Sequence, residues 1–241
     1  MKIDVEGIVI SQNPYKEKDA MVSILTENGI ISFLARSIQS ISSKNKASCL
    51  PFSCSLFTLN IKQDKVSLVQ GKLLKSYYQL YNSLDRLASV NLINECILKF
   101  VDEDNSSLYL YLKSYLELLS LGFDETTLSA IMLAQIVKNS GYDLEFNSCV
   151  NCKSKTNIVG VSYDMGGFVC KKCISALNQK RSKEYLKTFR YLFMVPHDMM
   201  NHYVIDSEIG YKIIGELCNY LAKSFGYTII KSLEVYKTSK K

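Results

Sequence analysis

Two pairs of cysteines constrain this chain more than any other feature of its sequence. The first Cys-x-x-Cys motif is formed by Cys149 and Cys152, and the second by Cys170 and Cys173. Seventeen residues separate the two motifs. This is the spacing of a four-thiolate zinc site. A two-residue turn lets both sulfurs of a pair reach one metal at about 2.3 Å, and a short hairpin can return the second pair to complete a tetrahedron. The four cysteines are therefore predicted to hold one structural zinc ion.

The residues between the two pairs fit this interpretation. Residues 158–163 and 168–169 read as two short strands around the turn 164–167. Four thiolates leave no open coordination position, so the metal is expected to hold structure and not to activate water. Two alternatives stay open: four reduced cysteines without a metal, or a thioredoxin-like redox pair, which would need a single Cys-x-x-Cys on a βαβ pattern.

The remaining cysteines and the lengths of the apolar runs indicate the cellular compartment of the protein. The chain has eight cysteines in 241 residues, and the four outside the motif are scattered. Cys54, Cys96 and Cys218 lie in apolar runs, where free cysteine packs as a small hydrophobic residue. No signal-peptide core and no apolar run near ~18 residues is present. These features predict a protein of the reducing cytoplasm without a membrane partner.

Charge is distributed unevenly along the chain. Residues 1–82 carry ten Lys/Arg against six Asp/Glu, residues 83–148 carry four against ten, and residues 149–190 carry nine against two. A basic front and a basic cysteine segment therefore flank an acidic middle. This pattern suggests that the two basic parts contact a polyanionic partner. The alternative is that these Lys and Arg residues are ordinary solvated surface residues.

The first 80 residues read as β structure. Five short strands are expected, at 2–10, 21–26, 30–35, 55–61 and 66–69, the last running on toward residue 77. Glu27, Asn28 and Gly29 give a tight-turn signal between the second and third. Five strands in ~80 residues suit a small closed barrel of the oligonucleotide-binding type, and an SH3-like barrel has the same strand count. The long polar loop 37–51 between strands three and four is expected to be mobile.

From residue 84 the apolar pattern becomes helical. Helices are expected over 84–101, from 106 or 107 to 121, and from 124 or 126 to 139, forming an antiparallel bundle with the zinc hairpin inserted after the third. Further helices are expected over 174–180, 182–194 and 209–225, followed by a short β-branched tail at 227–230. The predicted fold class is α+β, with a barrel domain at 1–80 and a helical-bundle domain at 81–241 that carries the zinc module at 149–173.

Sequence motifs for catalysis are missing. There is no Gly-rich phosphate loop, dinucleotide fingerprint, deaminase signature, His-Glu-x-x-His or Gly-x-Ser-x-Gly. The carboxylates of Asp102, Glu103 and Asp104 lie in a polar break and are expected to be solvated. His197 and His202 are interpreted as loop histidines, since neither has an evident nucleophile or metal partner. The chain is predicted not to be an enzyme.

Several short strings, in order, resemble one protein family. They are Gly7-Ile-Val-Ile10, Tyr15-x-Glu17-x-Asp19, Leu25-Thr-Glu-Asn-Gly29, Pro51-Phe52, Ser140-Gly-Tyr142, the two cysteine pairs around Gly166-Gly167, and Ser232-Leu233. Over nearly its full length the chain resembles the RecO family of bacterial DNA repair and recombination proteins. One departure is that Arg36-Ser37 stands where the family usually has Lys-Gly followed by Arg or Lys; basic residues resume here only at Lys44 and Lys46.

The resemblance implies a fold and a function. It implies an oligonucleotide-binding barrel packed on a helical domain with a zinc module. RecO-like proteins bind single- and double-stranded DNA, anneal complementary strands, and with RecR help RecA replace single-strand-binding protein. The implied partners are therefore DNA, RecR and single-strand-binding protein directly and RecA indirectly, in the cytoplasm at the nucleoid.

Basic side chains beside a barrel groove can neutralise phosphates while bases stack on aromatic rings. The candidate DNA-contacting residues are Lys16, Lys18, Arg36, Lys44, Lys46, Lys72, Lys75, Lys153, Lys155, Lys171 and Lys172. Phe33 and Phe52 are candidates for base stacking, with the barrel core as the alternative. Two other functions stay open: a zinc-containing RNA-binding protein with the same barrel, and a non-catalytic adaptor that mainly binds proteins.

Overall fold

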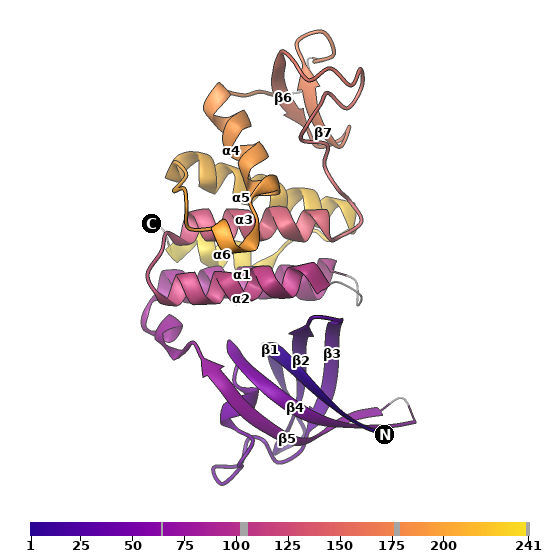
Figure 1. Cartoon of the computed structure of the whole chain (residues 1–241), viewed down its shortest axis with the longest axis vertical. Helices are drawn as coiled ribbons and strands as arrows, with labels where there is room; N and C mark the ends of the chain where they lie inside the picture. The colour runs from indigo at the N-terminus through magenta and orange to yellow at the C-terminus, as the bar shows by residue number, and fades with distance from the viewer. Residues whose placement is uncertain (64, 102–105, 176–178, 240–241) are drawn as a thin grey trace. The chain divides into compact units, whose positions relative to one another are not determined.

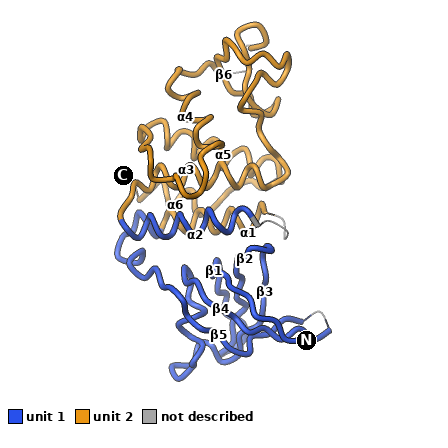
Figure 2. Tube along the Cα trace, viewed as in Figure 1, with its two compact units in different colours: residues 1–87, 102–121 blue, residues 88–101, 122–241 orange. Residues whose placement is uncertain are grey.

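The computed structural model describes residues 1–63, 65–101, 106–175 and 179–239. These residues fall into two compact units (Figure 2). The first unit comprises residues 1–87 and 102–121, and the second comprises 88–101 and 122–241. Among the described residues, none of the helices has the length and apolar character that crossing a membrane requires.

Five strands of the first unit close into a barrel, as predicted (Figure 1). They are β1 (Lys2–Tyr15), β2 (Asp19–Thr26), β3 (Gly29–Ala35), β4 (Ser53–Lys62) and β5 (Lys65–Ser76). Their order around the barrel is β1-β2-β3-β5-β4. All neighbours are antiparallel except β3 and β5, which pair in parallel. This is the Greek-key arrangement of the oligonucleotide-binding fold, which decides against the SH3-like alternative.

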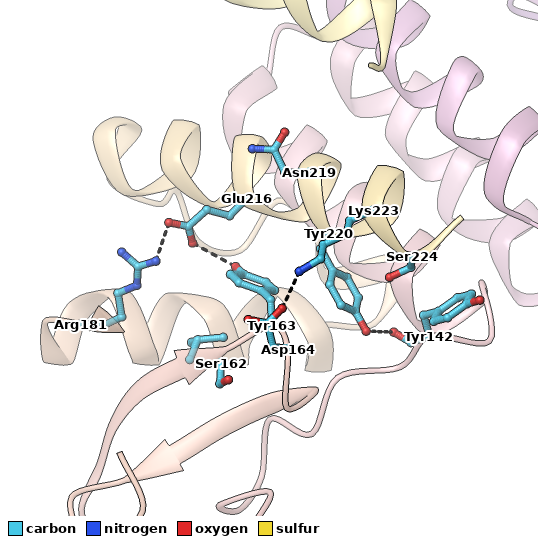
Figure 3. Close-up of a pocket in the computed structure, with 11 residues that line it drawn as sticks. Tyr142, Ser162, Tyr163, Asp164, Arg181, Glu216, Asn219, Tyr220, Lys223 and Ser224 are labelled. Carbon is cyan, nitrogen blue, oxygen red and sulfur yellow. Dashed lines mark hydrogen bonds and ion pairs between the residues drawn. The ribbon is translucent and has the colours of Figure 1, made fainter. Parts of the chain in front are cut away.

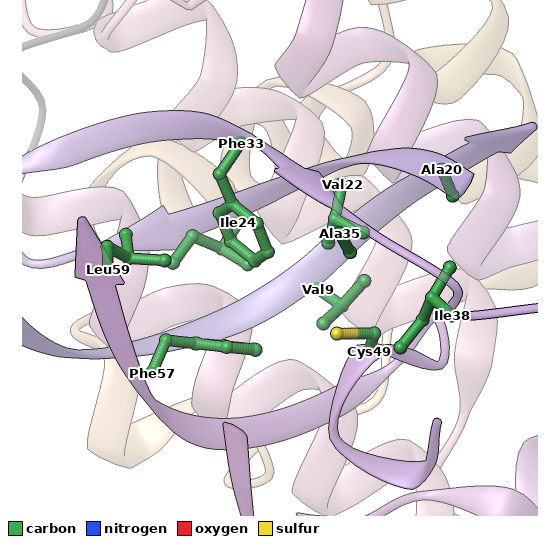
Figure 4. Packing of buried hydrophobic residues seen from close by; sticks show 10 residues of the cluster. All are labelled: Val9, Ala20, Val22, Ile24, Phe33, Ala35, Ile38, Cys49, Phe57 and Leu59. Carbon is green, nitrogen blue, oxygen red and sulfur yellow. The ribbon is translucent and has the colours of Figure 1, made fainter. Parts of the chain in front are cut away.

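Alternate residues of these strands fill the barrel interior (Figure 4). The core consists of Val9, Ala20, Val22, Ile24, Phe33, Ala35, Ile38, Cys49, Phe57 and Leu59. The rings of Phe33 and Phe57 lie 5.3 Å apart. Ile38 and Cys49 come from the loop expected to be mobile, so both ends of that loop are anchored in the core. Inside the loop, the Asn45 side chain accepts a hydrogen bond from the backbone N–H of Gly71.

Helices and short 3-10 turns make up most of the rest of the described residues, and Figure 1 labels the helices. The helices are α1 (Leu84–Phe100), α2 (Ser106–Ser120), α3 (Glu125–Lys138), α4 (Lys183–Met194), α5 (Ser207–Ser224) and α6 (Lys231–Ser239), and the 3-10 turns are η1 (Ala47–Cys49), η2 (Tyr78–Asn82) and η3 (His197–Met199). Asp124, Ser182 and Asp206 begin α3, α4 and α5 by accepting a backbone N–H in the first turn. Ser107, one of the two predicted caps of α2, is the second residue of that helix. The side chain of Ser106, the other predicted cap, and the three consecutive carboxylates lie outside the description.

The three helices of the expected bundle are divided between the two units. α2 belongs to the first unit, where the Glu6 carboxylate of β1 accepts hydrogen bonds from the Tyr109 hydroxyl at 2.6 Å and from the Lys113 ammonium at 2.9 Å. α3 instead forms the centre of the second unit, where residues 126–137 are all buried. It packs on α5 and α4, and the Gln135 side chain donates to the carbonyl of Leu192 on α4.

Two local expectations are corrected. Residues 179–180, expected to end a helix, form strand β8 (Gln179–Lys180), which pairs with β6 (Ile158–Ser162) because a sheet edge is available there; residues 176–178 lie outside the description. The segment 227–230 is not a strand but leads into α6, which the sequence does not signal. The N-terminal N–H groups of α6 at Lys231 and Ser232 donate to the carboxylate of Glu95 on α1.

Candidate metal centre and nucleic-acid surfaces

The four predicted cysteines form one cluster. Their Sγ atoms all lie within 4.8 Å of one another, and those of Cys152 and Cys170 are 3.6 Å apart. A tetrahedron with metal–sulfur bonds of about 2.3 Å has edges of about 3.8 Å, so these sulfurs need only small shifts to hold one ion. All eight cysteines are free thiols. The cluster can therefore bind a metal, and in the described part of the chain no other group of His, Cys, Asp or Glu side chains is placed to do so.

Backbone turns position the sulfurs. After the first pair, the N–H of Lys153 donates to the carbonyl of Cys149, and Lys153 has a left-handed φ of 58° that turns the chain sharply. In the second turn, the N–H of Cys173 donates to the carbonyl of Cys170. The N–H of Cys170 also donates to the Cys149 sulfur at 3.4 Å. Burial raises the pKa of the Cys149 thiol, but hydrogen bonds from the N–H groups of Cys152, Cys170 and Asn151 outweigh it and lower that pKa to about 6. The first turn thus favours the thiolate of Cys149. The pKa of Cys173 is instead raised to about 12, chiefly because of its hydrogen bond with Cys152.

A hairpin of β6 and β7 (Gly167–Cys170) carries the second pair to the first. Gly167 is essential to it, because its φ is 144° and a Cβ there would lie 2.2 Å from the carbonyl oxygen of Glu145. That oxygen accepts the N–H of Phe168, and the Glu145 N–H donates to Gly166. The segment before the first cysteine pair is thereby tied to the hairpin. With β8 added, the three-stranded sheet β7-β6-β8 and the cysteine turns make up what we call the metal module, residues 144–181.

One carboxylate attaches the metal module to the helices (Figure 3). The Glu216 carboxylate of α5 accepts a hydrogen bond from the Tyr163 hydroxyl and forms a 2.6 Å ion pair with Arg181. It also accepts a hydrogen bond from the hydroxyl of Tyr185 on α4. The Arg181 side chain is only 5% exposed and that of Glu216 is 20% exposed. Burial and the neighbouring carboxylate raise the pKa of Tyr185, so its hydroxyl stays a donor at neutral pH. A cavity of about 570 Å³ lies beside this network, between β6 and α5.

We expect Glu216→Gln to lower the free energy of unfolding of the second unit by roughly 2–4 kcal/mol. The change leaves the Arg181 guanidinium buried without a counter-charge, and breaking a buried pair in this way costs about 3–5 kcal/mol when both partners are fully buried. Urea unfolding measures the loss. The matched control is Asp164→Asn, which breaks the exposed pair with Lys223 (79% and 77% exposed) and should cost about 0–1 kcal/mol. Equal losses in the two variants would contradict the assignment.

All eleven predicted DNA-contacting residues lie on the surface, in several separate places. Lys16 and Lys18 are in the β1–β2 turn, Arg36 follows β3, Lys44 and Lys46 are in the loop before η1, Lys72 and Lys75 are on β5, and Lys153, Lys155, Lys171 and Lys172 are on the cysteine turns and the segment leading to β6. Lys75 already forms an ion pair with Glu117 of α2. The predicted residues are thus spread over several places, and one of them, Lys75, has a counter-charge.

A groove of about 600 Å³ lies on the outer face of the barrel. It is lined by Tyr15, Met21, Ser32, Leu34, Arg36, Asn60, Lys62, Gln63, Lys65, Val66 and Ser67. Its walls are therefore the end of β1, strands β2 and β3, and the β4–β5 hairpin. Oligonucleotide-binding barrels use the face of their second and third strands to bind nucleic acid. Arg36 is the one predicted contact in this lining. Tyr15, Lys62 and Lys65 were not among the predicted contacts. Lys62 and Lys65 flank the predicted strands 55–61 and 66–69, which was a usable signal, whereas Tyr15 lies beyond the predicted strand 2–10.

A second groove, of about 530 Å³, lies where the metal module meets α4. Its lining includes Lys155, Lys183, Lys187 and Arg190, and contains no carboxylate. Lys155 alone was predicted. Arg190 is held in place because its Nε donates to the carbonyl of Phe146 at 3.0 Å. Lys183, Lys187 and Arg190 recur at helical spacing on α4, so they lie on one face of the helix. That spacing is a signal in the sequence that was not used in predicting the contacts.

Phe33 and Phe52 are not base-stacking residues. Phe33 is fully buried in the barrel core, and Phe52 packs against Tyr81 with 3% exposure. The core alternative is therefore the correct one for both. His197 lies in η3 and His202 in the turn after it, as expected for residues between helices.

Comparison with known proteins finds matches to one family over most of the chain. A family model described as Recombination protein O N terminal matches residues 1–77, and one described as Recombination protein O C terminal matches residues 81–213. The chain is 28% identical over 172 residues to a DNA repair protein RecO of Halalkalibacterium halodurans, covering 70% of this chain and 68% of that protein. It is 30% identical over 172 residues to the Bacillus velezensis protein of that name (70% and 67%). It is 23% identical over 243 residues to the Clostridium novyi protein (98% and 94%).

Proposed function

This chain belongs to the RecO family of DNA repair proteins, and from that premise we propose that it binds single- and double-stranded DNA and anneals complementary strands. In the same proposal it acts with RecR to help RecA replace single-strand-binding protein, in the cytoplasm at the nucleoid. It does so by binding and not by catalysis. Nucleic-acid binding is assigned to the domain 1–80, and the domain 81–241 supplies the helical body and the metal module.

The groove on the barrel face carries this proposal. Its described charged lining residues are Arg36, Lys62 and Lys65, and none of them forms an ion pair with another described residue. Cations without counter-charges in a groove can replace the counterions of a phosphate backbone, which is the main source of DNA affinity. Lys16 and Lys18 extend the positive charge along the β1–β2 turn beside it.

The metal in this proposal is one structural zinc ion held by Cys149, Cys152, Cys170 and Cys173. Zinc prefers four thiolates in a tetrahedron, and the sulfur separations and N–H···S bonds of this cluster suit that geometry. The ion would cross-link the two cysteine turns and supply no reactive position. The basic residues on the turns, Lys153, Lys171 and Lys172 among them, would then keep their places relative to α4.

Annealing requires two strands to be neutralised at once. The barrel groove and the groove beside α4 supply two cationic surfaces, and the second contains four cations without a carboxylate. We assign one strand to each. We assign Lys44 and Lys46, in the loop before η1, to the strand that the barrel binds, and Lys171 and Lys172, on the second cysteine turn, to the other strand; none of the four lines a groove.

The test is a fluorescence annealing assay on purified protein with zinc measured on the same sample. We expect the double reversals Lys44→Glu/Lys46→Glu, Lys171→Glu/Lys172→Glu and Lys183→Glu/Lys187→Glu each to slow annealing severalfold and to flatten its dependence on salt. The control is Lys212→Glu/Lys231→Glu, which makes the same change of charge at residues outside both grooves, the loop before η1 and the cysteine turns. If the control slows annealing as much, net charge and not two surfaces explains the activity. A DNA–RNA competition that favours RNA would support an RNA-binding protein instead.

A further inference from the structure

Tyr15 occupies a distinctive place in the barrel groove. It ends β1, where it pairs with Asp19 across the β1–β2 turn, and its side chain is 45% exposed. It is the aromatic residue among the described residues that line the groove. The ammonium of Lys16 lies 5.4 Å from the centre of its ring. A half-exposed ring beside a cation, at the edge of a basic groove, can stack on the base of a nucleotide while the cation contacts its phosphate.

The other aromatic residues near the barrel do not offer such a surface in the groove. Phe33, Phe52, Phe57 and Tyr77 are buried. Tyr78 is exposed, but it lies in η2 and does not line the groove. Within the described part of the barrel, a base that enters the groove therefore has the ring of Tyr15 to stack on.

The neighbours of Tyr15 extend this surface. Met21 is partly exposed and lies beside it in the lining, on the strand that pairs with β1, and Leu34 is the partner of Met21 across β2 and β3. Apolar side chains follow the ring along the groove, while Arg36, Lys62 and Lys65 provide the charge. A nucleotide chain lying here would place its bases on the apolar strip and its phosphates near the cations.

Stacking on a protein ring distinguishes unpaired from paired strands. In a duplex each interior base already lies between two neighbours and its face is unavailable, whereas an unpaired base is free to stack. Phosphate contacts alone recognise both forms. We propose that Tyr15 stacks on an unpaired base in the barrel groove and thereby sets the preference of this protein for single-stranded over double-stranded DNA. The inference rests on the proposed function, since it assumes that the groove binds DNA.

The chain contains no tryptophan, which makes a direct test available. Tyr15→Trp places a single indole at the position of the ring. We expect an unstructured oligothymidine to quench its fluorescence, and a blunt-ended hairpin duplex to leave it nearly unchanged. Tyr78→Trp is the matched control: its indole is exposed (63% for the native ring) but outside the groove, and it should respond to neither. If oligothymidine binds the Tyr15→Trp variant and leaves the indole fluorescence unchanged, the inference is overturned.

Affinity provides the second readout. Tyr15→Ala should weaken oligothymidine binding by roughly 5- to 150-fold, the range that one lost base–aromatic stack corresponds to, and should leave duplex binding within about twofold. Tyr15→Phe should bind like the unmodified chain, because the ring and not the hydroxyl stacks. Equal weakening for both DNA forms would overturn the role in discrimination. If the unmodified chain binds neither form, the proposed function itself fails, a result distinct from the loss of preference alone.

Discussion

Replacing Cys149 with serine is expected to abolish zinc binding and to unfold the metal module. Cys149 is fully buried at the centre of the cluster and its sulfur accepts the N–H of Cys170, so no other side chain can take its place. Structural zinc supplies about 10–16 kcal/mol in zinc-finger peptides. The hairpin has few buried side chains of its own, Val161, Phe168 and Val169 among them, and cannot replace that energy.

Two measurements check this result. Elemental analysis should show that zinc falls from one ion per chain to none, and limited proteolysis should cleave the variant within residues 144–173 while the barrel persists. Cys218→Ala is the control, because Cys218 is equally buried but lies in α5 outside the cluster, and it should keep its zinc. A Cys149→Ser protein that retains one zinc ion and resists the protease would contradict the assignment of the ligands.

Removing two charges from the barrel groove is expected to weaken single-stranded DNA binding by roughly tenfold or more at low salt. In Arg36→Gln/Lys62→Gln, two phosphate neutralisations disappear. Each contributes about 0.7 to the slope of log affinity against log salt for single strands, so the slope should fall by about 1.4. The affinities of the variant and of the unmodified chain should therefore converge as salt rises. Fluorescence anisotropy of a labelled oligonucleotide over a range of salt concentrations measures both quantities.

The control for this variant is Lys223→Gln/Lys237→Gln. Lys223 is paired with Asp164 and Lys237 with Glu234, and neither residue lines the barrel groove or the groove beside α4. The net charge changes by the same amount, and the slope should stay within experimental error of the original. If both double variants flatten the slope equally, the overall charge of the protein accounts for binding and the groove does not.

Patterns that depend on near neighbours in the chain were predictable. The spacing within each cysteine pair restricts both sulfurs to one metal, and the structure confirms the cluster of all four. Asp124 and Ser182 begin their helices because a side chain there reaches an N–H only three residues ahead. Alternation and the Asn28-Gly29 turn likewise identified the first strands of the barrel, since the period of a strand is local.

Features that join distant residues were not predictable. α6 has nine residues, too few to be stable alone, and its first turn depends on Glu95, more than 130 residues earlier. β8 forms because β6 offers it an edge, and Lys75 is occupied because α2 places Glu117 beside it. The metal module is held in part through Glu216, which no local sequence pattern marks.

The sequence by itself determined which four cysteines cluster, that the barrel has five strands, and where most helices begin, because each depends on spacing within a few residues. Only the tertiary structure decided which cations share a groove and which are neutralised. Lys62 and Tyr15 are far apart in the chain and line one groove because the barrel closes with β5 between β3 and β4. Barrel closure and strand order are long-range properties, and the charge of a surface follows from them.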